Sequence, residues 1–78
     1  MVNIDDLLGQ AYRLDQQAGH RPEAVALIRD AAKDLSVAAV LRQRRDQLRQ
    51  VREARRFGDR DGCHVTATMV DLLNAALP

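Results

Sequence analysis

The residues best suited to chemistry in this 78-residue chain are arginines that recur at helical spacing between positions 42 and 56. At ~100° per residue of an α-helix, spacings of three and four residues place them in one narrow arc. A guanidinium donates two parallel hydrogen bonds to a carboxylate or a phosphate, so such a row suits either anion. This arginine row comprises Arg42, Arg45, Arg49, Arg52 and Arg56.

Three interpretations of the arginine row stay open. It is a solvated helix face with internal ion pairs, a contact for an acidic partner protein, or a contact for nucleic-acid phosphates. Internal pairs would join Asp46 to Arg42 and Glu53 to Arg49, because residues four apart are neighbours on a helix. A formal net charge of +1 and a single lysine weigh against nucleic acid.

Two further arginines, Arg44 and Arg55, fall among the apolar residues of the same helix. A lone buried charge is costly, so each should reach water along its aliphatic stem or find a carboxylate. Alternatively, this side of the helix is a subunit interface in which they pair across chains. The candidate carboxylates are Asp15, Asp30, Asp34 and Asp71.

Nucleophilic or metal chemistry has little to build on. Cys63 and His64 are adjacent, and neighbouring side chains of an extended stretch point apart, so they make a poor catalytic pair. A zinc site on Cys63 and His64 would need a third and a fourth ligand. These would be His20 with Asp59 or Asp61, brought together from loops without any paired-ligand spacing. We therefore expect no catalytic residue, no cofactor, no metal site and no small-molecule substrate.

The elements that position these residues are expected to be helices. Apolar residues at spacings of three and four, with abundant alanine and leucine, are typical of amphipathic helices. Asn3 suits an N-cap, Gly19 a helix stop and Pro22 a first helical turn. The sequence predicts an all-α fold, a small self-associating bundle of three to four helices in a single domain, 1–78. The expected helices are 4–18, 22–35, 37–57 and 68–77.

Two boundaries leave alternatives. Nothing around Ser36 forces a break, so one long bent helix over 22–57 competes with the favoured interpretation of two helices. Residues 63–67 alternate in polarity and are partly β-branched, which predicts a short extended stretch. Thr68, with Asp71 three residues on, would then form a capping box for the last helix.

Part of the N-terminal half resembles a known helical repeat. Leu8-Gly9-x-x-Tyr12, followed by Ala24-x-x-x-Ile28-x-x-Ala31, is similar to the small-and-large residue pattern of a tetratricopeptide helical hairpin. The two halves of the pattern lie three residues further apart than in that family, and Ser36 stands in place of the usual proline. The resemblance implies binding of a peptide or helix in a groove.

Three features of the sequence predict where in the cell the protein is found. The chain starts with acids where a secretion signal has bases, and its longest apolar run, 37–41, is far short of a membrane span. Cys63 is the only cysteine, so no internal disulfide forms. We therefore expect a cytoplasmic protein that does not enter a membrane.

The predicted function is a small protein–protein interaction module, an adaptor, small chaperone or regulator, and not an enzyme. An apolar helix face flanked by the arginine row would bind a protein partner or a second copy, with a homodimer expected because so small a core needs reinforcement. The alternative is a nucleic-acid-binding regulator that uses the arginine row on phosphates. The expected interface residues are Leu41, Arg44, Leu48, Val51, Arg55, Met69 and Leu72.

Overall fold

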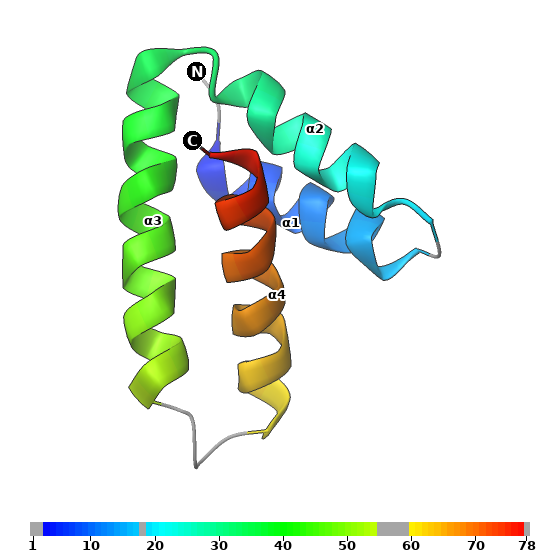
Figure 1. Cartoon of the computed structure of the whole chain (residues 1–78), viewed down its shortest axis with the longest axis vertical. Coiled ribbons are helices and arrows are strands. Elements are labelled where there is room, and N and C mark those ends of the chain that lie inside the picture. The colour runs from blue at the N-terminus through cyan, green and yellow to red at the C-terminus, as the bar shows by residue number, and fades with distance from the viewer. Residues whose placement is uncertain (1–2, 18, 55–59, 78) are drawn as a thin grey trace.

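The chain folds into a small all-α bundle, as the sequence predicts (Figure 1). The computed structural model describes residues 3–17, 19–54 and 60–77, except for the side chains of 60–63. Its helices are α1 (Ile4–Gln16), α2 (Arg21–Ala31), α3 (Leu35–Ala54) and α4 (Arg60–Ala76). None of these described helices is long and apolar enough to cross a lipid bilayer.

Local signals account for the first two helices. The Asp6 backbone N–H donates to the Asn3 side-chain oxygen over 3.2 Å, which confirms the expected N-cap of α1. The connection to α2 contains Gly19 at φ +81°, a left-handed conformation that glycine adopts without a Cβ clash. Pro22 lies in the first turn of α2, where its missing N–H leaves no hydrogen bond unmade.

A break separates α2 from α3, so these segments are two helices and not one long helix. The Ser36 backbone N–H donates to the Asp34 carboxylate over 2.9 Å at the start of α3. The Asp34 side chain therefore caps α3. The α2 helix ends at Ala31, earlier than expected, because the chain turns through 32–34 to reach α3.

The prediction for the last helix was wrong at its start. Residues 63–67 are helical, and α4 begins at Arg60 instead of at residue 68. Thr66 and Thr68 are both buried inside α4, so Thr68 caps nothing. Packing overrides the weak local preference of β-branched residues for extended backbone, because the buried side of α4 continues upstream of Met69.

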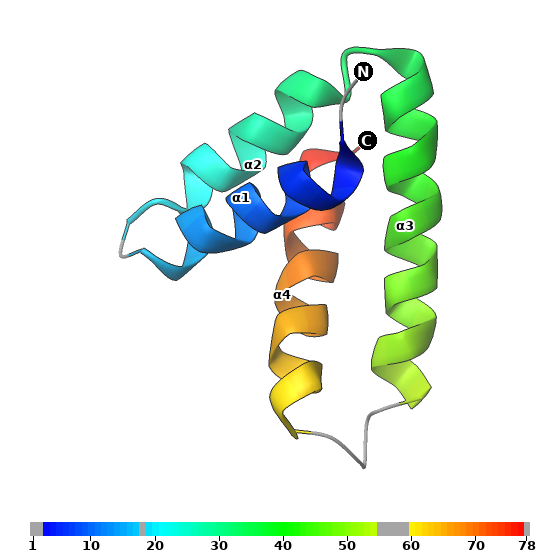
Figure 2. The ribbon, with the colours of Figure 1, turned by 180° about the vertical axis from the view of Figure 1, so that it is seen from behind.

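The α4 helix is the centre of the bundle and contacts all three other helices. It runs beside α3, while α1 and α2 form a hairpin that crosses its C-terminal half (Figures 1 and 2). The α1 helix lies behind α4 in Figure 1 and in front of it in Figure 2, so it covers one side of α4 only. Among the described residues, the largest fully buried side chains are Ile28, Leu41, Val70, Leu72 and Leu73.

Candidate interaction surfaces

The arginine row lies on α3, and its members differ in surroundings. Arg42 and Arg49 are exposed, and among the described residues they form no ion pair. The Arg45 side chain is 19% exposed, and its Nε lies 3.4 Å from the Asp46 carboxylate. The Nη1 atom of Arg52 lies 3.8 Å from the Oδ1 atom of Asp71 on α4. Arg56, the last member, lies outside the described residues.

The expected four-residue ion pairs of α3 do not form between the described side chains. Asp46 pairs with its neighbour Arg45 instead of with Arg42, and Glu53 has no ion pair with Arg49. Both acids remain exposed. The two expected ion pairs are therefore absent among the described residues, while the exposure of Arg42 and Arg49 agrees with a solvated helix face.

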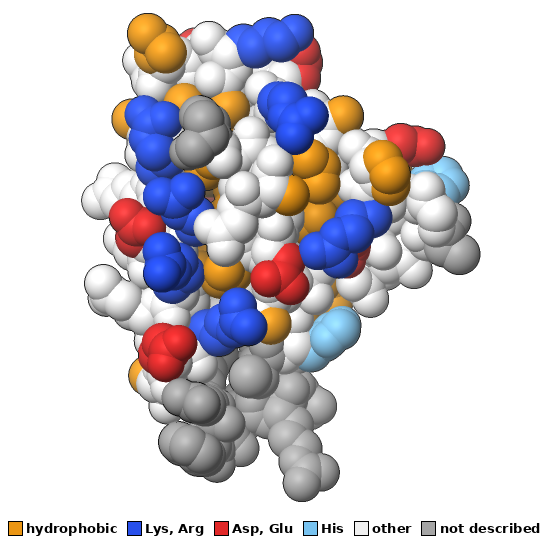
Figure 3. Space-filling view, in the orientation of Figure 1, with side chains coloured by type: hydrophobic (Ala, Val, Ile, Leu, Met, Phe, Trp, Pro, Cys, Tyr) orange, Lys and Arg blue, Asp and Glu red, His pale blue; other side chains and the backbone are white. Residues whose placement is uncertain are grey.

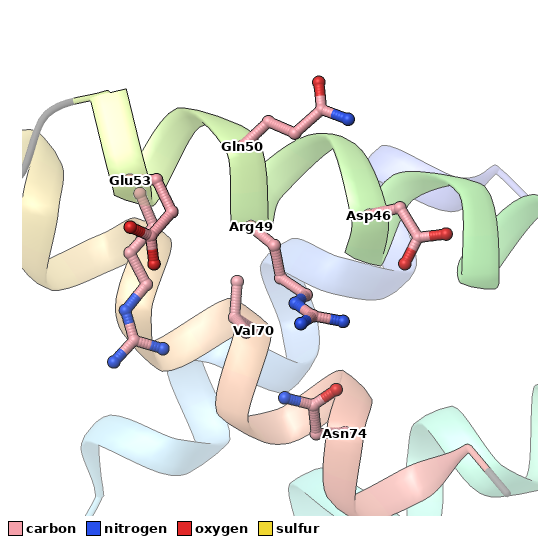
Figure 4. A pocket seen from close by; sticks show the side chains of 7 residues that line it. Asp46, Arg49, Gln50, Glu53, Val70 and Asn74 are labelled. Atoms are coloured by element: carbon pink, nitrogen blue, oxygen red, sulfur yellow. The ribbon is translucent and has the colours of Figure 1, made fainter.

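A polar groove of about 900 Å³ follows the junction of α3 and α4. Arg49 points across it from α3 toward Val70 and Asn74 of α4, between Asp46 and Glu53 (Figure 4). The space-filling view shows blue and red side chains alternating along α3 on this side of the molecule (Figure 3). Cations and anions thus share the groove, which favours a ligand carrying both charges over a pure polyanion.

An apolar hollow of about 250 Å³ lies where α1, α3 and α4 meet. Val65 of α4 is 43% exposed at this hollow, a large fraction for an apolar residue in so small a core. Gly9 of α1 has no atom within 4 Å of the position where a Cβ would lie, so the hollow stays open there. Its lining consists of Leu8, Gly9, Tyr12, Arg44, Leu48, Val65 and Met69.

Among the described residues that line the hollow, Arg44 alone is charged. Its Nη1 donates to the Asp5 carboxylate of α1 over 2.8 Å, and its side chain is 34% exposed. The sequence did not offer Asp5 as a partner. The proposed carboxylates are engaged elsewhere, with Asp34 at the start of α3 and the others in ion pairs: Asp15 with Arg21, Asp30 with Lys33 and Asp71 with Arg52. Arg55 lies outside the described residues.

Several expected interface residues belong to the chain's own core. Leu41 and Leu72 are fully buried and Met69 is 7% exposed, so the first two cannot contact a partner while this fold persists. Periodicity identifies which side of a helix is apolar, but it does not say whether the same chain covers that side. Leu48 and Val51 are half-buried, and of these two Leu48 lines the hollow.

Sequence reasoning missed the hollow's most exposed residue. Val65 lies in the stretch that the sequence predicts to be extended, and Leu8, Gly9 and Tyr12 belong to the repeat-like pattern of the N-terminal half. The signal that could have found it is the spacing from Val65 to Met69 and Leu72, four and then three residues, which continues the apolar side of α4 upstream.

The hollow and the groove open on different sides of the α3–α4 pair. The hollow takes part of its lining from α1, whereas the groove is lined by α3 and α4 alone. Leu41 and Arg45, which lie between the two surfaces on α3, are covered within the bundle. None of the four described members of the arginine row, Arg42, Arg45, Arg49 and Arg52, lines the apolar hollow.

Of the remaining candidates for chemistry, the structure describes only the side chains of His20 and His64. His20 Nδ1 lies 3.2 Å from the Glu23 carboxylate at the start of α2, and His64 is exposed on α4. Cys63, Asp59 and Asp61 have side chains outside the described residues. Within the described part of the chain, no three His, Cys, Asp or Glu residues gather as metal ligands would. Comparison with protein-family models, curated proteins and solved structures found no match to this chain.

Proposed function

We propose that this chain is a protein–protein interaction module that receives one face of a partner helix in the apolar hollow. The half-exposed Val65, set among Leu8, Tyr12 and Leu48, is the observation that carries the proposal. An amphipathic helix offers apolar side chains three and four residues apart, and a hollow of about 250 Å³ takes one or two such anchors.

Arg44 would orient the partner. A guanidinium carries five N–H donors, and Asp5 accepts a hydrogen bond from Nη1. An acidic side chain next to the partner's apolar anchors can accept from the donors that remain, which fixes register more than it raises affinity. The module would serve as an adaptor, small chaperone or regulator, and we propose the cytoplasm as its setting because Cys63 is the only cysteine.

The test selects helical peptides from a displayed library and maps their binding sites by chemical-shift perturbation of the labelled protein. Val65→Asp places a charge in the hollow and should abolish binding. Val40→Asp is the matched control, because Val40 is 44% exposed on α3 and lies outside the hollow. Selected peptides that bind elsewhere, or that bind the Val65→Asp variant as well as the Val40→Asp variant, would refute the proposal.

Nucleic-acid binding through the arginine row is the second candidate. Arg42 and Arg49 favour it, because both are exposed and neither has an ion pair among the described residues. Each phosphate contact would contribute about −0.9 to the slope of log affinity against log salt for duplex DNA, so five contacts give about −4.5. Arg49→Ala should make that slope shallower by about 0.9. Absence of binding to random-sequence duplex DNA at low salt would exclude this function.

A further inference from the structure

One exposed face of α3 carries charges of alternating sign. Arg42, Asp46, Arg49 and Glu53 are spaced by four, three and four residues, which places all four side chains on the same side of the helix. All four are exposed, and blue and red side chains alternate along α3 in Figure 3. We call these four residues the α3 seam.

The α3 seam is complementary to itself when its direction is reversed. Its midpoint lies between Gln47 and Leu48. At 1.5 Å rise per residue, Asp46 and Arg49 lie ~2 Å on either side of that midpoint, and Arg42 and Glu53 lie ~8 Å on either side. Reversal about the midpoint therefore exchanges each cation of the seam with an anion.

We infer that a second copy of this chain binds along the α3 seam, with its own α3 antiparallel and a two-fold axis through the seam's midpoint. Arg42 then faces Glu53 of the other copy and Asp46 faces its Arg49, and the symmetry repeats both pairs. Four ion pairs form, and the two guanidinium groups that have no carboxylate partner within the described chain each receive one. Asp46 can take part because its side chain is 58% exposed beside Arg45.

Other occupants fit the seam less well. A nucleic acid would bring phosphates against Asp46 and Glu53 as well as against the arginines, and like charges oppose binding. An unrelated protein would need the same alternation at the same spacing, which a second copy supplies by symmetry. This self-association does not use the hollow, so it stands or fails independently of the proposed function.

The dimer should be sensitive to salt, because exposed ion pairs are weak and are screened at high ionic strength. The Debye length falls from ~10 Å at 0.1 M salt to ~3 Å at 1 M. Light scattering after size exclusion should detect the dimer at low salt and the monomer near 1 M. A chain that stays monomeric at low salt across the accessible concentrations would overturn the inference.

Charge reversal tests the pairing directly. Arg42→Glu with Arg49→Glu makes the seam wholly acidic, and Asp46→Arg with Glu53→Arg makes it wholly basic. Either double variant alone should be monomeric, because each ion pair becomes a repulsion. An equimolar mixture of the two should form a heterodimer, because all four attractions return.

The matched control changes two cations outside the seam. Arg13→Glu with Lys33→Glu alters net charge as much as the acidic seam variant does, and both positions are exposed. This control should dimerise like the original chain, and circular dichroism should find every variant folded. A dimer that survives in either seam variant, a mixture without heterodimer, or a control that becomes monomeric would each overturn the inference.

Discussion

Leu41 holds α3 onto the rest of the bundle, and its truncation should remove a large part of the protein's stability. Only Leu41 and Ala38 are buried on the described length of α3, and Leu41 is fully buried. A buried Leu→Ala change costs about 2–5 kcal/mol through lost transfer free energy and the cavity left behind. A domain of this length has a free energy of unfolding of about 4–12 kcal/mol, so Leu41→Ala should remove roughly half of it.

Urea denaturation followed by far-UV circular dichroism measures the change. Leu35→Ala is the matched control, because it deletes the same atoms from the same helix at a residue that is 82% exposed. We expect Leu35→Ala to stay within about 0.5 kcal/mol of the original chain. If Leu41→Ala cost no more than about 1 kcal/mol beyond Leu35→Ala, the account of α3 as anchored by this side chain would be refuted.

Three further predictions concern caps, glycines and the ion pair at the hollow, each measured by denaturation. Asn3→Ala removes the acceptor at the start of α1 and should cost about 1 kcal/mol; no loss would show that the capping bond contributes nothing. Gly9→Ala should stabilise the protein by about 0.5–1 kcal/mol, because Gly9 lies inside α1 and the added Cβ would meet open space. Gly19→Ala should destabilise it by about 1 kcal/mol, because Gly19 has a φ of +81°. Stability changes of the same sign in both variants would contradict this reasoning. Arg44→Ala should lower the free energy of unfolding by at most about 1 kcal/mol, because the Asp5 side chain that pairs with it is 78% exposed. This loss of stability should become smaller as salt is added. A larger loss that does not depend on salt would mean that the aliphatic stem of Arg44 contributes more than its charge.

The sequence predicts elements well where the signal is local. Asn3, Gly19 and Pro22 each act within a few residues of their own position, and they delimit α1 and α2 to within two residues at most ends. The start of α4 fails because its β-branched residues favour extended backbone locally, while burial against the other helices decides the outcome. Tertiary packing of this kind leaves only a weak trace in the sequence.

The candidate surfaces also include some features that helical spacing predicts and others that depend on tertiary packing. Helical spacing alone is enough to place Arg42, Arg49 and the two acids of the α3 seam on one side of a helix. It cannot supply the partner of Arg44, because Asp5 lies 39 residues away in the chain. Nor can it separate buried Leu41 from half-buried Leu48, since both lie on the apolar side of α3 and differ only in how far the rest of the bundle covers them.

The position of α4 determines how binding at the α3 seam would affect binding at the apolar hollow. Because the α3 seam and the hollow lie on different sides of the α3–α4 pair, a dimer formed along the seam leaves both hollows open. Two linked hollows turn the second binding event into an intramolecular one, so a partner with two helices, or a dimeric partner, binds more tightly than either site alone. By linkage, such a partner strengthens a seam dimer that rests on weak exposed ion pairs. A partner with a single helix has no such effect, because it binds the monomer and the dimer equally.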